Sequence, residues 1–139
     1  RKTQIAAGGK GRVMIFLNMG TNGNANGALY AKDAALLISQ LKTAWGQTGA
    51  PADDLVFVLT ATAEWSSYNP DSASAGAKAL ASTEANVVAY DLAKDFGINQ
   101  STLVGAFAYA GASSTPQAHL SVDGYYIIIE AIMNSLKTL

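Results

Sequence analysis

Residues 12–19 read RVMIFLNM, an almost unbroken apolar run, and residues 20–27 after them read GTNGNANG. Strands of a parallel sheet have such a composition because helices cover both of their faces. Glycine and asparagine favour loops, since their backbones adopt left-handed angles readily. The two segments together predict a buried parallel strand that ends in a loop.

Further elements follow along the chain. Residues 28–45 change to a helical spacing of apolar side chains. This spacing places on one side Tyr30, Leu37, Leu41 and Trp45. Residues 55–60 (LVFVLT) predict a second strand, and the alanine-rich residues 73–96 predict a helix with Gly97 as its C-cap.

The last third of the chain predicts a short strand at residues 102–110 and a helix at residues 121–136. The alternation of strands and helices predicts an α/β fold, a parallel sheet flanked by helices in a flavodoxin-like, three-layer α/β/α arrangement. Sheets usually have about five strands. We therefore expect further, N-terminal strands that are missing from this chain or come from another one, with residues 1–11 as a linker or entry loop.

The composition excludes several classes of function. The chain of 139 residues has a net charge of −1 and no block of basic residues, which argues against nucleic acid as a partner. It has no cysteine and one histidine, so we expect no disulfide, no metal site and no cofactor. Its apolar runs are too short for a membrane helix. Because it begins with Arg1, we expect a processed or recombinant piece whose targeting signals can be lost.

Ligands of open parallel sheets bind in the loops that follow the carboxyl ends of the strands. Three segments meet this condition: residues 20–27, 61–72 and 110–119. The glycine-rich residues 8–11 (GGKG) precede a strand, whereas a phosphate-binding loop follows one, so we exclude them as a phosphate site.

Asn22 is the candidate oxyanion donor of the first loop, which also contains Gly20 and Thr21. Its side-chain amide, held in a partly dry pocket, can stabilise developing negative charge on a carbonyl oxygen. The alternative is a simple helix entry in which Asn22, Asn24 or Asn26 is the N-cap.

His119 is the candidate general base, because it is the single imidazole and precedes the last helix, where Ser121 can act as N-cap. The alternative is a surface histidine in a loop. In the second loop, Trp65 is a candidate for substrate contact, with packing as the alternative. Other residues there that could line a pocket are Glu64, Tyr68 and Asp71.

Two blocks of the sequence resemble conserved blocks of the SGNH (GDSL-like) esterases. FLNMGTNG at residues 16–23 resembles the family's third block, a hydrophobic strand that ends in Gly-x-Asn-Asp. HLSVDGYYIIIEAIMNSL at residues 119–136 resembles its last block, in which Asp-x-x-His-Leu-Ser-x-x-Gly-Tyr opens the C-terminal helix. The resemblance covers nearly all of the chain and implies that residues 12–139 are the C-terminal part of such a domain.

The resemblance implies that Asn22 is the oxyanion donor, that His119 is the base, and that Gly20 permits the tight turn before Asn22. It also implies that the nucleophilic serine belongs to an N-terminal Gly-Asp-Ser block, which this sequence lacks. A missing N-terminal segment or another chain would then supply the serine.

Two positions depart from the family pattern. Gly23 stands where the family has an aspartate, and Pro116 stands three residues before His119, in place of the aspartate of the triad. His119 would then be oriented by a backbone carbonyl or by another acid, and loss of a triad acid can cost orders of magnitude in rate.

The leading hypothesis is therefore part of a serine esterase that removes acetyl or other short acyl groups, with a small ester or an acylated carbohydrate as substrate. The alternative is a non-catalytic SGNH-like domain for carbohydrate binding or assembly, as in a phage tail spike or a secreted protein. Either hypothesis favours an extracellular or virion-associated protein and allows a homo-oligomer. A nucleotide-binding module would require a phosphate loop after the first strand, which the sequence does not contain.

Overall fold

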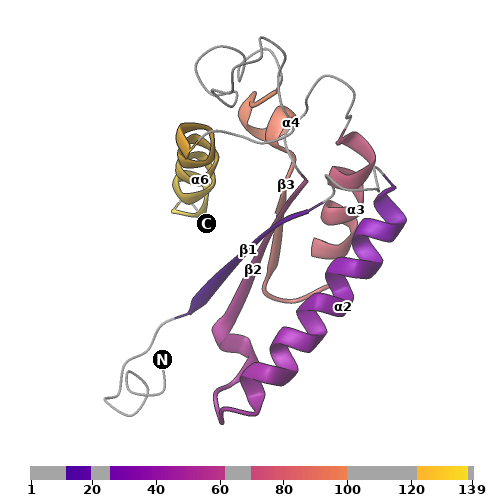
Figure 1. The fold of residues 1–139 in the computed structure, drawn as a ribbon, viewed down its shortest axis with the longest axis vertical. Helices are drawn as coiled ribbons and strands as arrows, with labels where there is room; N and C mark the ends of the chain where they lie inside the picture. The colour runs from indigo at the N-terminus through magenta and orange to yellow at the C-terminus, as the bar shows by residue number, and fades with distance from the viewer. Residues whose placement is uncertain (1–11, 20–25, 62–69, 100–121, 138–139) are drawn as a thin grey trace.

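The described residues form a parallel sheet of three strands in the order β1-β2-β3 (Figure 1). A computed structural model describes residues 12–19, 26–61, 70–99 and 122–137 of the chain. Within these ranges the strands are β1 (Val13–Met19), β2 (Leu55–Ala61) and β3 (Val87–Tyr90). β2 is the central strand.

Helices cover the sheet from two sides. α2 (Gly27–Gly46) and α3 (Asp71–Ala81) lie on one face, and α6 (Val122–Leu136) lies on the other (Figure 1). The short helices η1 (Ala52–Asp54) and α4 (Leu92–Phe96) lead into β2 and out of β3. The predicted α/β fold with a parallel sheet between helices is confirmed. No helix in the described ranges combines the length and the apolar character that a membrane span needs.

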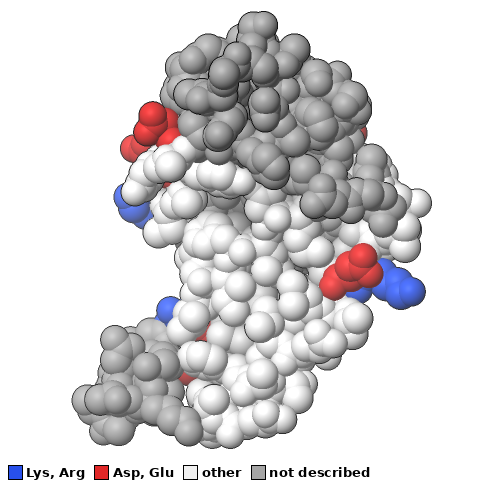
Figure 2. Space-filling model, viewed as in Figure 1, with Lys and Arg blue, Asp and Glu red and all other residues white. Residues whose placement is uncertain are grey.

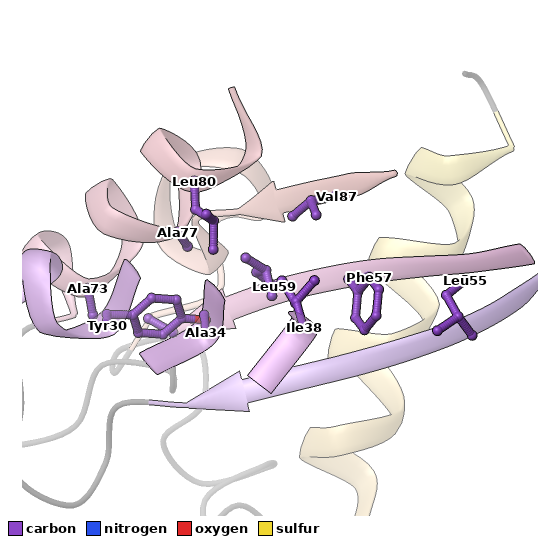
Figure 3. Close-up of a cluster of buried hydrophobic side chains, with 11 residues drawn as sticks. Tyr30, Ala34, Ile38, Leu55, Phe57, Leu59, Ala73, Ala77, Leu80 and Val87 are labelled. Carbon is purple, nitrogen blue, oxygen red and sulfur yellow. The ribbon is translucent and has the colours of Figure 1, made fainter. Parts of the chain in front are cut away.

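The core on the α2 side is built from alternate residues of β2. Leu55, Phe57 and Leu59 are almost completely buried and pack with the apolar residues of α2 and α3 (Figure 3). Their neighbour Val58 points to the opposite face and packs with Ile128 of α6. Each fully buried side chain of this size contributes roughly 1.5–3 kcal/mol. β2 is thus apolar on both faces because both faces are covered.

A pair of glycines lets the start of α2 touch the first half of α3. A Cβ atom at Gly76 of α3 would collide with the carbonyl oxygen of Gly27, and one at Gly27 would collide with that of Ser72. The amide of Gly27 donates to the Ser72 Oγ atom at 2.9 Å. The start of α2 is therefore held against α3 by a close backbone contact that requires glycine at both positions.

The predicted helix over residues 73–96 is wrong in its second half. α3 ends at Ala81, and the chain then forms β3 and the short helix α4. Val87 and Val88 favour a strand, and Asn86, with a φ of 61°, turns the chain into it. The Asn86 carbonyl accepts a hydrogen bond from Phe57 of β2 at 2.8 Å. Strand pairing with β2 thus overrides the local helical preference of the alanines.

The other predicted elements within the described residues are confirmed. The helix at residues 28–45 corresponds to α2, the helix at residues 121–136 to α6, and the strand at residues 55–60 to β2. Gly97 is a C-cap with a φ of 68°, although the helix that it ends is α4. The predicted strand at residues 102–110 and the predicted linker at residues 1–11 lie outside the described residues.

Candidate functional site

The proposed catalytic and substrate-binding residues lie outside the described part of the chain. These residues are Gly20, Thr21, Asn22, Trp65 and His119. The two departures from the family pattern, Gly23 and Pro116, lie there as well, as do Glu64 and Tyr68. The described residues define the framework from which these segments leave.

The carboxyl ends of β1 and β2 are level with each other. All seven residues of β1 pair with β2 in register, from Val13 opposite Leu55 to Met19 opposite Ala61. The chain therefore leaves the sheet towards residues 20–25 and towards residues 62–69 from neighbouring points on one edge. This is the edge at which open parallel sheets bind ligands.

Three polar residues form a row across the sheet just before this edge. Asn18 of β1 pairs with Thr60 of β2, which pairs with Tyr90 of β3. The hydroxyl of Tyr90 is buried and has no hydrogen-bond partner among the described residues, while its ring contacts that of Phe96 with centroids 5.1 Å apart. The row depends on strand register, and Tyr90 fell within the predicted helix, so sequence reasoning missed it. The visible signal was a polar residue near the end of each apolar run.

A hydrogen bond from α2 holds the end of β2 in place. The Tyr30 hydroxyl, buried beneath α2, donates to the Thr60 carbonyl at 3.0 Å. Such a hydrogen bond contributes about 1 kcal/mol net to the free energy of unfolding, and its removal takes a partner away from a buried carbonyl. The helix that follows β1 thus fixes the carboxyl end of the neighbouring strand.

The start of α2 is capped by the protein itself. Asn26 is the N-cap, and its Oδ1 atom accepts from the amides of Ala28 at 3.0 Å and Leu29 at 3.3 Å. The Gly27 amide is bound to the Ser72 Oγ atom. The proposed N-cap role is therefore confirmed for Asn26. Helix amides occupied in this way are not free to cradle a phosphate, which argues against the nucleotide-binding hypothesis.

Ion pairs join α3 to α4 beside the end of β3. Asp91 is buried and caps α4, and its Oδ2 atom lies 3.3 Å from the Lys94 Nζ atom. Lys94 also pairs with Asp71 at 2.9 Å, and Lys78 pairs with Asp95 at 2.8 Å. Asp71, a candidate for lining a pocket, thus lies in the first turn of α3 and joins two helices.

These ion pairs shift two pKa values. Burial opposes ionisation of Asp95, but the hydrogen bonds from Lys78 and from the Asp91 amide outweigh it and hold the pKa of Asp95 below its ordinary value. The hydrogen bond to Asp71, followed by that to Asp91, raises the pKa of Lys94. Both shifts favour the charged forms and identify a structural network. Within the described ranges, no cluster of three or more histidine, aspartate or glutamate residues could hold a metal ion.

Comparison of the chain with protein-family models, with curated proteins and with solved structures finds no match.

Proposed function

We propose that this chain is part of an SGNH-type serine esterase and supplies Asn22 as oxyanion donor and His119 as general base. The substrate is an ester of acetate or another short acid, and a carbohydrate is the alcohol that we favour. The serine comes from a further segment or from another chain. The proposal stands on the two sequence blocks, on the parallel α/β fold and on one property of β1.

That property is the exposed apolar face of β1, and it supports the proposal of an additional strand. Among the described residues, β1 pairs only with β2. On the face opposite α2, Met14 and Phe16 are 37% and 41% exposed. Natural edge strands are usually protected by charges, proline or a bulge, and Val13–Met19 has neither charge nor proline. These features favour a missing neighbour strand.

A parallel strand on this edge would end beside Met19 and next to the segment that contains Asn22. A serine just beyond its end would then lie within reach of the oxyanion donor. In the proposed reaction, the serine oxygen attacks the ester carbonyl and His119 accepts its proton. The Asn22 amide donates to the oxyanion, an interaction worth roughly 3–4 kcal/mol in such sites.

The second half of the reaction uses the same groups. His119 returns the proton to the leaving alcohol, and water then attacks the acyl-enzyme with His119 again as base. We propose that Gly20 and Thr21 shape the oxyanion loop and that Trp65 contacts the substrate. Because Pro116 replaces the acid of the triad, His119 acts in a Ser-His dyad or with another acid.

The test compares the protein as its gene encodes it with this chain alone on p-nitrophenyl acetate. We expect hydrolysis by the former only. His119→Ala should reduce the rate of hydrolysis by about 100-fold or more, because His119 is the proposed general base. Asn22→Ala should cost about 100- to 1,000-fold in kcat. Asn24→Ala is the matched control and should retain activity. Unchanged hydrolysis by His119→Ala would refute the assignment.

The second candidate is a non-catalytic SGNH-like domain that binds carbohydrate or serves in assembly. Gly23 and Pro116 favour it, since both replace aspartates of the family pattern. It predicts an encoded protein without a reactive serine, which a fluorophosphonate probe would leave unlabelled, and measurable binding to an acylated polysaccharide.

A further inference from the structure

Asp91 is a buried carboxylate at the end of the sheet where parallel α/β folds bind their ligands. It directly follows Tyr90, the last residue of β3, and is 3% exposed. Its Oδ1 atom accepts from the Lys94 amide at 3.0 Å, and its Oδ2 atom lies 3.3 Å from the Lys94 Nζ atom. Because each carboxylate oxygen can accept more than one hydrogen bond, these contacts leave capacity for a further donor.

The burial of Asp91 sets it apart from the other acids of its network. The charged groups around it are Lys94 and Asp95 of α4 and Asp71 and Lys78 of α3. The side chains of Asp71 and Asp95 are 61% and 30% exposed, and Asp91 is the one buried acid in the described ranges. In the view of Figure 2, the described surface carries few acidic side chains, so few carboxylates compete with Asp91 for a role in the site.

The known contacts of Asp91 do not require a buried charge. Its side chain is the N-cap of α4, and asparagine or serine caps a helix equally well. Its ion pair is made with Lys94, whose side chain is 63% exposed, and exposed ion pairs contribute little to stability. A buried carboxylate that serves neither role better than an uncharged residue points to a further partner.

α6 packs against the part of the chain that contains Asp91. Tyr90 and Leu92, on either side of Asp91, belong to one buried cluster with Ile128 and Ile132 of α6. In Figure 1, the C-terminal end of α6 points away from α4, so α6 begins at the end of the sheet where α4 begins. The N-cap of α4 and the start of α6 therefore lie on the same side of the molecule.

His119 is tied to this place by the chain itself. It lies outside the described residues, three positions before Val122, the first residue of α6. Three residues of chain span at most about 11 Å, which limits how far the His119 backbone can lie from Val122. The region that His119 can occupy thus surrounds the start of α6.

A histidine base needs an acceptor at its second ring nitrogen, because this contact fixes the tautomer in which Nε2 can take a proton. The family pattern places the acid where this chain has Pro116. We propose that Asp91 is the positioning residue of His119: its carboxylate accepts a hydrogen bond from Nδ1–H, while Nε2 takes the proton of the serine. Asp91 itself takes no proton. This inference rests on the proposed function and names the acid that the proposed function leaves open.

The test uses Asp91→Asn in the protein as its gene encodes it, with p-nitrophenyl acetate as substrate. Asparagine still caps α4, so the variant removes the charge and keeps the shape. We expect kcat to fall by about 100-fold or more with KM nearly unchanged, because the amide allows the wrong tautomer of His119. A carboxylate raises the pKa of a neighbouring imidazole, so the acid limb of the pH profile of kcat/KM should also move to lower pH.

Lys94→Ala is the matched control, because it breaks the ion pairs with Asp91 and Asp71 but keeps the Asp91 carboxylate. It should retain most of kcat and move the acid limb to higher pH, since the carboxylate then acts on His119 without a counter-charge. Circular dichroism verifies that both variants are folded. Equal losses of kcat in the two variants, or an acid limb that Asp91→Asn leaves in place, would show a structural role and overturn the proposal.

Asp123→Asn tests the acid that follows His119 most closely in the sequence, in the first turn of α6. A loss of kcat in this variant together with an active Asp91→Asn variant assigns the role to Asp123 and overturns the proposal. The outcome also separates this inference from the proposed function. An active His119→Ala variant refutes both, whereas an inactive His119→Ala variant beside a fully active Asp91→Asn variant refutes the role of Asp91 alone.

Discussion

β1 and β2 are neighbouring strands of equal length and similar apolar composition, but their surroundings differ. β2 is buried along nearly its whole length, with Phe57 on the α2 side and Val58 on the α6 side. In β1, half-buried and exposed residues alternate, and the exposed set includes Phe16. The comparison shows that the apolar sequence of a strand reflects the packing partners that the strand needs, whether or not those partners are among the described residues.

The largest effect is expected from a matched pair of phenylalanine truncations that tests this comparison. Phe57→Ala removes a ring that is 0% exposed and should lower the free energy of unfolding by about 3–5 kcal/mol. Phe16→Ala in the chain alone should cost less than about 1 kcal/mol, since its ring is already partly hydrated. Urea denaturation followed by circular dichroism measures both. Equal losses would mean that the two strands are equally buried.

The next test concerns the helices that follow the two strands. Gly76→Ala places a Cβ atom against the Gly27 carbonyl and should destabilise the chain by about 1–3 kcal/mol. Gly46→Ala is the control, since open space surrounds the Cβ position there, and it should be neutral or stabilising by up to about 1 kcal/mol. Thermal unfolding separates the two variants. A neutral Gly76→Ala variant would contradict the close approach of α2 and α3.

A smaller effect is expected where α2 holds the end of β2. Tyr30→Phe removes the hydroxyl that donates to the Thr60 carbonyl and should cost about 1–2 kcal/mol. Hydrogen exchange should increase most at the carboxyl ends of β1 and β2. Tyr126→Phe, on an exposed residue of α6, is the matched control and should change neither quantity.

The smallest effect concerns the ion pairs that join α3 to α4 beside the end of β3. The pKa of Asp95 is lowered in the folded state, so its contribution is complete above the unfolded value, near 3.8, and is lost as pH falls through the folded value. Asp95→Asn should therefore cost less than about 1 kcal/mol at pH 7 and nothing in strong acid. Denaturation at pH 7 and at pH 2.5 gives the difference. An equal loss at both pH values would assign the effect to shape instead of charge.

The sequence predicted those elements whose signal is local. β1, β2, α2 and α6 follow from apolar runs and from helical spacing, and Gly97 ends a helix as expected. β3 was missed because the alanines before Val87 favour a helix, and its partner β2 lies far away in the sequence. Local propensity contains no information about such pairing.

The framework of the candidate site was predicted in part. The rule that sites follow strand ends identified the segments after β1 and β2, and the level ends of these strands agree with it. The row of Asn18, Thr60 and Tyr90 arises from register, which no single segment specifies. The roles of Asn22 and His119 remain predictions from the sequence blocks.

The exposed apolar side chains of β1 also have a consequence for the behaviour of the chain in solution. Exposed apolar side chains on a strand at the edge of a sheet promote aggregation. We therefore expect this chain, when expressed by itself, to aggregate in a concentration-dependent way, starting from Met14 and Phe16. A single lysine in place of Phe16 would act as a gatekeeper and improve solubility with little loss of stability. Poor solubility of the isolated chain would thus be a property of one strand and not of the whole fold.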